Sequence, residues 1–163
     1  MKSNPRHPRL LALLVLLSLS PLAGCQGGSA SSASGAPTLP TVPVRLGNKT
    51  FTLEVAANEA NRERGLMRRD DMPADHGMIF VFTEPSDVGF YMKNTRIPLD
   101  IVFLAEDGSV ISIKQMKPFD LSTTRADGPA KWAIELNKDA AAAAGLKVGD
   151  KVQIPEAARA AEP

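Results

Sequence analysis

Cysteine and histidine are scarce in this chain of 163 residues, which contains one of the first and two of the second. Because Cys25 is the only cysteine, the sequence excludes internal disulfides and cysteine metal sites. His7 lies in a segment that we expect to be removed, so His76 would be the only imidazole of the mature chain, and a site built from several histidines is excluded. We therefore expect no metal and no cofactor.

An excess of positive charge is also missing. The chain has 19 Lys and Arg against 18 Asp and Glu. Three of the basic residues lie in the expected leader, and without them 16 remain against 18, a net charge of about −2. Nucleic-acid-binding domains usually carry a basic surplus. The sequence therefore predicts no nucleic-acid partner.

An export signal begins the chain. Lys2, Arg6 and Arg9 precede an apolar run over 10–19, which is too short to span a bilayer. The following Leu22-Ala23-Gly24-Cys25 resembles the lipobox of bacterial lipoproteins, in which the cysteine is acylated and becomes the first mature residue. The alternative is an ordinary secretory signal in which the cysteine is coincidental.

These patterns divide the chain into four expected parts. They are a signal peptide over 1–24, a lipidated flexible tether over 25–43, a globular domain over 44–155 and a disordered tail over 156–163. The lipid on Cys25 would make the membrane a partner in the cell envelope. Gln26 follows it, and the resemblance to lipoproteins implies the outer membrane, facing the periplasm, if the cell has two membranes.

The domain has the pattern of a mainly β (α+β) fold. Alternating residues over 50–55 and 131–136 predict half-buried strands, and the apolar runs over 78–82 and 99–104 predict buried ones. Asp107-Gly108 predicts a hairpin from the second run into 110–116. We expect a last strand over 151–154. The best-fitting architecture is a small antiparallel β-sandwich or partly closed barrel with two short helices.

The two helices are predicted from their caps. Asn58 is suited to begin a short helix that ends at Gly65. Asn137 is suited to begin a second helix over 138–144, with Gly145 as its terminator.

A polar loop between buried strands is the first candidate site. It runs from Lys93 through Asn94 and Thr95 to Asp100. The Pro98 ring keeps the preceding residue extended, so the loop should be stiff. Its polar groups are available to bind a ligand carboxylate or phosphate, or for acid/base work. The alternative is that they only satisfy backbone groups at a sheet corner.

A basic turn after the first helix is the second candidate. Arg64 and Arg68 flank Gly65-Leu66-Met67, with Arg62 and Arg69 beside them, and such a cluster can clamp an anionic group. Cations at a helix C-terminus also explain part of this pattern without any ligand.

The strand over 131–136 supplies the last candidate. Trp132 and Glu135 differ in parity, so they should face opposite sides of the sheet. Trp132 is then core, and Glu135 points to solvent or to the site loop. His76 lies in an expected turn, where a single histidine more often has no catalytic role.

Several segments together resemble domain-of-unknown-function family 192 (DUF192). The matching blocks are Arg64-Gly65-Leu66-Met67-Arg68-Arg69, Gly77-Met78-Ile79-Phe80-Val81-Phe82, Tyr91-Met92-Lys93-Asn94-Thr95 with Ile97-Pro98-Leu99-Asp100-Ile101, and Ile134-Glu135-Leu136. Tyr91 stands where the family usually has Trp. The resemblance implies a compact, mostly β domain that is often secreted or anchored, and it implies no established activity. It also favours a shared binding surface made by the polar loop and the basic turn.

Two functions are then open. The first is an uncharacterised envelope lipoprotein that binds a small anionic ligand, a glycan or an envelope protein without catalysis, through Arg64, Arg68, Lys93, Asn94, Thr95, Asp100 and Glu135. The second is a hydrolase or lyase acting on an envelope polymer, with Asp100 or Glu135 as acid/base. We favour the binding module because the sequence shows no activated nucleophile, metal cluster or phosphate-binding glycine motif.

Overall fold

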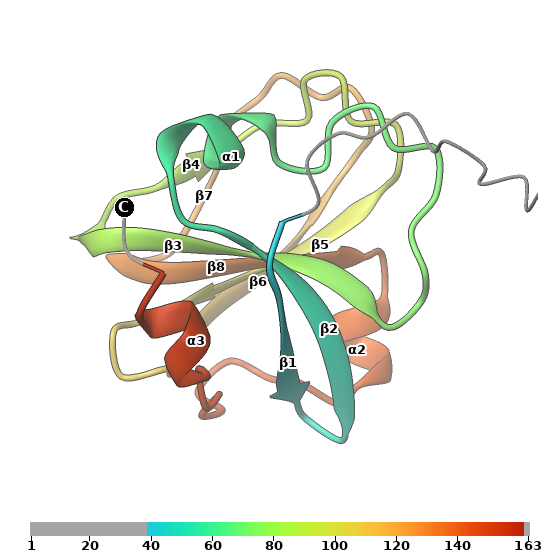
Figure 1. Cartoon of the computed structure of the whole chain (residues 1–163). Coiled ribbons are helices and arrows are strands. Elements are labelled where there is room, and N and C mark those ends of the chain that lie inside the picture. Colours follow the sequence, from blue (N-terminus) through green and yellow to red (C-terminus); the bar gives the residue numbers. More distant parts are fainter. Residues whose placement is uncertain (1–38, 162–163) are drawn as a thin grey trace, which may run out of the picture. The chain divides into compact units, whose positions relative to one another are not determined.

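Strands dominate residues 39–161, the part of the chain that the computed structural model describes. The strands are β1 (Thr41–Leu46), β2 (Lys49–Ala56), β3 (His76–Ser86), β4 (Gly89–Phe90), β5 (Leu99–Leu104), β6 (Val110–Met116), β7 (Thr124–Arg125) and β8 (Ala130–Asn137). The helices are α1 (Glu59–Arg64), α2 (Ala140–Ala143) and α3 (Glu156–Arg159). The domain is thus mainly β, as predicted (Figure 1). The expected signal peptide, Cys25 and nearly all of the expected tether lie outside the described residues.

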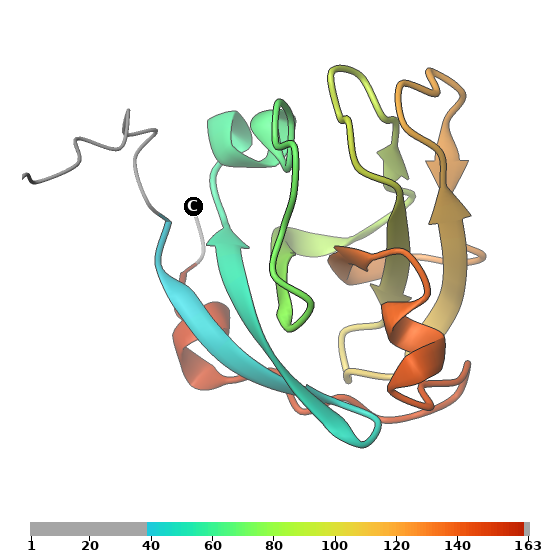
Figure 2. The ribbon, with the colours of Figure 1, turned by 90° about the vertical axis from the view of Figure 1, so that its right-hand side faces the viewer.

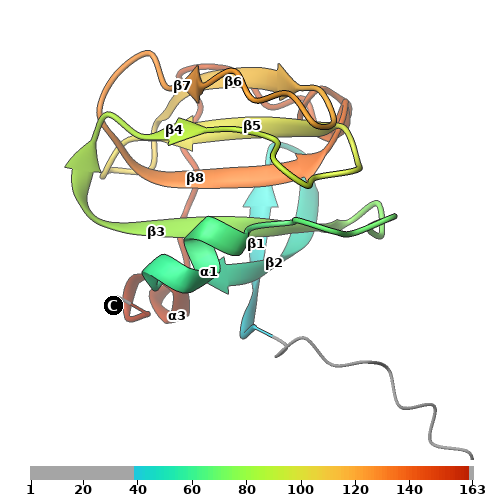
Figure 3. The ribbon, with the colours of Figure 1, turned by 90° about the horizontal axis from the view of Figure 1, so that it is seen from above.

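Six strands form one sheet in the order β1-β2-β3-β8-β5-β6, while β4 and β7 form a separate pair. The order leaves β1 and β6 as edges, so the sheet is not a closed barrel. Its neighbours are antiparallel except for β2 and β3, which run parallel. A parallel pair needs a crossover connection, and the chain between β2 and β3 supplies it with α1 (Figure 3). The sheet is therefore mixed, with one parallel pair within the antiparallel arrangement that we expected.

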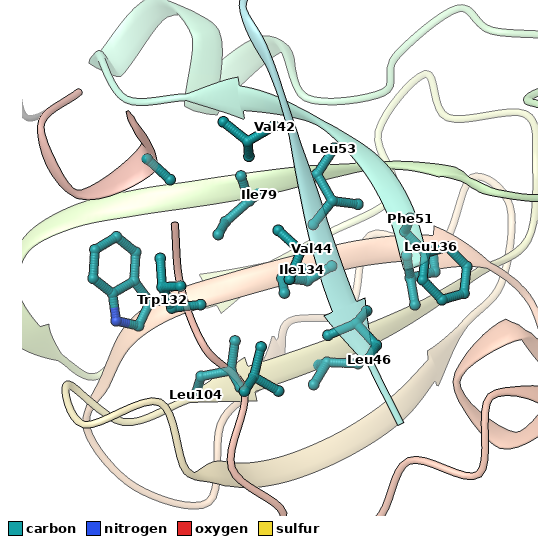
Figure 4. Close-up of a cluster of buried hydrophobic side chains, with 14 of the residues drawn as sticks. Val42, Val44, Leu46, Phe51, Leu53, Ile79, Leu104, Trp132, Ile134 and Leu136 are labelled. Atoms are coloured by element: carbon teal, nitrogen blue, oxygen red, sulfur yellow. The ribbon is translucent and has the colours of Figure 1, made fainter. Parts of the chain in front are cut away.

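Both faces of the sheet carry a hydrophobic core. On the first face, β1 crosses over the sheet so that Val42, Val44 and Leu46 pack toward Ile134 and Leu136 of β8 (Figure 4). Trp132 belongs to this core and is 2% exposed, which confirms that it is core. The second core gathers the residues that alternate with these, among them Met78, Phe80, Ile101, Phe103 and Ala133. Trp132 and Glu135 therefore face opposite sides of the sheet, as their parity predicts.

Local turn chemistry accounts for the connections next to the site. Asn58 caps α1, its side chain accepting a hydrogen bond from the Asn61 N–H at 2.9 Å, and Gly65 ends the helix, as predicted. The hairpin between β5 and β6 also forms, with Gly108 at φ +81° as the turn requires. The helix α1 and the loops at its end of the sheet are seen together at the top of Figure 2.

The C-terminal part differs from the expectation. The helix α2 begins only at Ala140, because Asn137 donates to the Met72 and Pro73 carbonyls instead of capping a helix. Residues 151–154 contribute a single β-bridge, between Lys151 and Ser109.

Residues 156–161, which we expected to be disordered, contain α3. Pro155 precedes the helix, and Ala158 is fully buried against the first core. The Arg159 guanidinium carbon lies 5.7 Å from the centre of the Trp132 ring. These contacts offset the ordering entropy that composition alone suggests would prevail.

Within residues 39–161, no helix is both long and apolar enough to cross a membrane.

Candidate functional site

The basic turn and the polar loop meet in the structure. The Arg68 N–H donates to the Asn94 carbonyl at 2.8 Å, and both residues have positive φ, +63° and +56°. Left-handed backbone is uncommon outside glycine, and it marks a sharp turn in each of the two segments at this hydrogen bond. The loop is in turn held by Thr95, whose carbonyl accepts from the Phe119 N–H at 3.1 Å. The two segments therefore form one stiff surface.

Two cavities open on this surface. The first, of about 260 Å³, is called the aromatic cavity and lies on the face of the second core. Phe80 and Phe90 meet edge to face at 4.9 Å between ring centres, and Phe82 and Phe90 at 6.4 Å. The remaining lining comes from Arg62, Glu63 and Arg64 of α1, from residues 65–67 and 88–91, and from Thr95 and Glu135.

The second cavity, of about 730 Å³, is called the arginine cavity. It is lined by Glu54, Ala60, Glu63, Arg64, Gly65, Met67, Arg68, Arg69 and Asn94. It shares Glu63, Arg64, Gly65 and Met67 with the aromatic cavity, so the turn after α1 forms part of both walls.

The three arginines of the arginine cavity differ in the hydrogen bonds and ion pairs that their side chains make. Arg69 makes a bidentate pair with Glu54, at 2.6 and 2.8 Å, and this hydrogen-bonded pairing raises the pKa of Arg69. Arg64 donates only to Asn61 Oδ1, at 3.1 Å. The Arg68 side chain makes no hydrogen bond or ion pair with any residue that the structure describes. Arg64 and Arg68 are therefore the cations available to an anion.

Glu135 lines the aromatic cavity. It is paired in register with Met78 on β3 and Ile101 on β5, both fully buried, and it is itself only 6% exposed. Burial raises its pKa to about 8, an effect that the positive charge of Arg69 opposes. Sequence parity indicated the correct face but not that the carboxyl group would be enclosed.

Asp100 is also buried, 2% exposed, but it lies on the other face. It is opposite Leu136 in the sheet, whereas Glu135 is opposite Ile101. One oxygen, Oδ2, accepts from the Ala141 N–H at 3.0 Å and so caps α2, while Oδ1 has no partner among the described residues. Asp100 therefore does not join the predicted surface, and the structure does not bring it together with Glu135 as an acid/base pair.

The other predicted residues are divided. Thr95 is 5% exposed and lines the aromatic cavity, and Asn94 lines the arginine cavity. Lys93 is exposed and lines neither. His76 Nδ1 lies within hydrogen-bond distance of the neighbouring Asp75 Oδ1, at 2.8 Å, and His76 also lies outside both cavities.

Several site residues were not singled out by the sequence pattern. Glu54 follows the alternation of β2 and could have been placed on the face of Glu135 from parity alone. Phe82 and Phe90 gave no usable signal, because their meeting depends on how the chain returns after β3.

Metal ligands do not cluster in the described part of the chain. Within residues 39–161, no group of three or more His, Asp or Glu side chains is placed to hold a metal ion. The arrangement instead offers two arginines, a buried carboxyl group and an aromatic wall.

The chain matches the DUF192 model, described as "Uncharacterized ACR", over residues 42–154. The chain belongs to this family. Two solved bacterial structures are similar to it, each with 34% sequence identity. One is a Sinorhizobium meliloti protein provisionally described as a transcription regulator, with a TM-score of 0.70 over 73% of this chain and 97% of that one. The other is a protein of unknown function from Novosphingobium aromaticivorans, with a TM-score of 0.65 over 74% and 94%. No curated protein matches the chain.

Proposed function

We propose that this DUF192 protein is an envelope lipoprotein whose domain acts as a non-catalytic binding module for a small ligand with an anionic group. The observation that supports this most directly is the hydrogen bond from Arg68 to Asn94, which joins the basic turn to the polar loop beside the arginine cavity. Guanidinium groups bind carboxylate and phosphate through paired hydrogen bonds. Arg64 and Arg68 are the groups that would hold the anion.

The aromatic cavity supports the same proposal by offering space for an apolar part of the ligand. Small-molecule sites are typically concave, mostly apolar and equipped with a few polar groups that fix orientation. The continuous wall through Arg64 and Gly65 would let one molecule place an acid in the arginine cavity and its body among Phe80, Phe82 and Phe90. A glycan or an envelope protein would have to use the same surface.

The regulatory role suggested for the Sinorhizobium protein is not extended to this chain. The mature sequence carries a net charge of about −2, which does not favour contact with a DNA backbone. An acid/base reaction by Asp100 and Glu135 is not favoured either, because the two lie on opposite faces of the sheet.

Binding is tested by titrating the purified full-length protein in detergent with 3-phenylpropanoate, a carboxylate with an apolar body, and with inorganic phosphate. We expect backbone amide NMR shifts in residues 64–69 and 91–95. Arg68→Ala should weaken binding at least about tenfold through loss of the charged hydrogen bonds. Arg45→Ala is the matched control, because Arg45 is an exposed arginine of β1 that lines neither cavity. Equal losses in both variants, or no response to either probe, would refute the proposal.

Anchoring is tested separately. Mass spectrometry of the mature protein should find the lipid on Cys25, and Cys25→Ser should abolish this modification. An unmodified mature chain that begins at another residue would contradict the lipoprotein part of the proposal and leave the binding part standing.

A further inference from the structure

Glu135 is an unusual residue for its position. It occupies the central strand β8 in a row with Met78 and Ile101, where an apolar side chain would fit the surroundings. No residue within 39–161 donates a hydrogen bond to its carboxyl group, and the attraction of Arg69 only partly opposes the effect of burial. A buried carboxyl group that accepts no hydrogen bond from the protein is costly and uncommon. Its hydrogen-bonding capacity is therefore available to a molecule that enters the aromatic cavity.

Gly65 keeps the space above this carboxyl group open. A Cβ atom at Gly65 would lie 3.8 Å from Glu135 Oε2 and 3.5 Å from Phe80 Cζ. The backbone there has φ +46° and ψ −135°, a conformation that essentially only glycine adopts. The turn thus places bare backbone over the carboxyl group, where any side chain would take up the opening.

The walls of the cavity suit a positively charged group. Aromatic rings attract cations through their π faces, most strongly where water is excluded. Arg62 already uses this wall, since its guanidinium carbon lies 5.7 Å from the centre of the Phe82 ring while Nη1 donates to the Val81 carbonyl at 3.0 Å. An ammonium group in this cavity would meet Glu135 with Phe80 beside it.

We infer that the aromatic cavity binds a small zwitterion with an apolar body, of the size of an amino acid, whose ammonium group pairs with Glu135 and whose carboxylate lies against Arg64. The inference rests on the proposed function, which supplies the anionic group, and adds the amine. Arg64 and Glu135 both line the aromatic cavity, so each charged group of such a ligand has a partner of opposite charge there. The aromatic cavity, at about 260 Å³, lies just below the range of roughly 300–1,000 Å³ for drug-sized ligands, which favours a small molecule.

Three probes separate the contributions of the two charged groups. L-phenylalanine carries both groups, 3-phenylpropanoate lacks the amine, and 2-phenylethylamine lacks the carboxylate. Isothermal titration of the full-length protein in detergent should show phenylalanine binding at least about tenfold more tightly than either analogue, because each charged pair contributes.

Two variants assign the two charged groups to residues. Glu135→Gln is nearly isosteric, and it should remove the advantage of phenylalanine over 3-phenylpropanoate. Arg64→Met should remove its advantage over 2-phenylethylamine. Glu59→Gln is the matched control, because Glu59 is an exposed carboxylate of α1, the helix that contains Arg64, and lines neither cavity. This variant should leave the affinities of all three probes unchanged.

The proton balance provides an independent readout. With its pKa raised to about 8, the Glu135 carboxyl group of the free protein must lose its proton to pair with an ammonium group. Phenylalanine should therefore release close to one proton at pH 7, and its affinity should rise by up to about tenfold per pH unit between pH 6 and 8.

The charged and titratable groups around Glu135 enter this pH experiment too. The helix α1 and the turn after it contribute Arg62, Glu63, Arg64 and Arg69. The strand β2 contributes Glu54, and the segment over 88–91 contributes Tyr91. His76 precedes Met78 by two residues on β3, so it lies on the same side of that strand as Met78. His76→Gln is therefore included, and the proton release should persist in it.

The outcomes distinguish the inference from the proposal beneath it. If 3-phenylpropanoate binds as tightly as phenylalanine and Glu135→Gln affects neither, the zwitterion is wrong while the anion-binding module stands. The zwitterion is also wrong if affinity falls as pH rises, because Glu135 would then donate its proton to a ligand acceptor. If no carboxylate probe binds and Arg68→Ala has no effect, both the inference and the proposed function fail.

Discussion

Among the described residues, each face of the sheet buries one carboxylate, and the two carboxylates differ in their hydrogen bonds and in their access to a cavity. On the first face Asp100 accepts a hydrogen bond from the backbone of α2 and lines neither cavity. On the second face Glu135 lies among apolar neighbours, lines the aromatic cavity and accepts no hydrogen bond from residues 39–161. The comparison shows that burial alone does not mark a functional carboxyl group. Asp100 Oδ1 also lacks a partner among the described residues, so what marks Glu135 is burial together with access from a cavity.

The largest expected change in the free energy of unfolding comes from replacing Glu135 with a residue that cannot ionise. Its pKa is about 8 in the folded protein against an ordinary 4.5, so between these values the folded state keeps a proton that the unfolded chain has lost. The free energy of unfolding should therefore fall as pH rises from about 4.5 to 8 and level off above pH 8. Glu135→Gln should remove this slope and make the domain roughly 3 to 5 kcal/mol more stable than wild type at pH 9.

Urea unfolding at pH 5, 7 and 9 measures this difference. Glu106→Gln, an exposed carboxylate in the turn between β5 and β6, should keep the wild-type slope. A wild-type stability that does not change with pH in this range would contradict the assignment of Glu135 as a buried, largely neutral acid.

Substitution of the buried carboxylate on the first face, Asp100, should lower the stability of the domain, whereas substitution of Glu135 should raise it. Asp100→Ala leaves the Ala141 N–H without its acceptor, and we expect a loss of roughly 2 kcal/mol in the free energy of unfolding. Asp100→Asn keeps an acceptor oxygen, so its loss in the free energy of unfolding should be smaller. Neither variant should alter ligand affinity at neutral pH in the NMR titration. A selective loss of binding in Asp100→Asn would show that the two faces are coupled.

A smaller effect is expected at Arg69. Arg69→Gln removes the bidentate pair with Glu54, which is partly exposed, so we expect a loss of about 1 kcal/mol in stability. It also removes the cation whose attraction lowers the pKa of Glu135, so that pKa should rise above its wild-type value. Carbon-13 NMR titration of the Glu135 carboxyl group measures the change, and an unchanged or lower pKa would mean that Arg69 does not act on it.

The smallest effect is expected at Lys93. This residue is exposed and lines neither cavity, so Lys93→Ala should change the free energy of unfolding by less than about 0.5 kcal/mol. Its affinity for 3-phenylpropanoate should stay within about twofold of wild type in low salt. A tenfold loss of affinity for 3-phenylpropanoate would show that Lys93 belongs to the binding site although it lines neither cavity.

Features set by neighbouring residues could be predicted from the sequence, and features set by distant contacts could not. Asn58 and Gly65 mark the ends of α1, and the Asp-Gly pair marks the hairpin, because each acts within a few residues. The capping of α2 by Asp100 could not be predicted, because the two partners are 41 residues apart.

The candidate site follows the same division. A shared surface of the basic turn and the polar loop was expected only from the family resemblance, and no local pattern pairs Arg68 with Asn94. Parity placed Glu135 on the correct face, but the closing of the cavity over it depends on where the crossover with α1 and the segment over 88–91 come to lie. Enclosure is a property of several distant segments, so it leaves no trace in the alternation of one strand.

The position of β8 has a consequence for how the molecule assembles. This strand is the last of the sheet in chain order, yet it lies between β3 and β5. Until residues 130–137 join, both of these apolar strands present an unpaired edge, and the sheet exists only as two unconnected halves. Folding must therefore wait for a late, long-range insertion, a topology that slows folding and prolongs exposure to aggregation. The strand that carries the buried acid is also the one that completes the sheet.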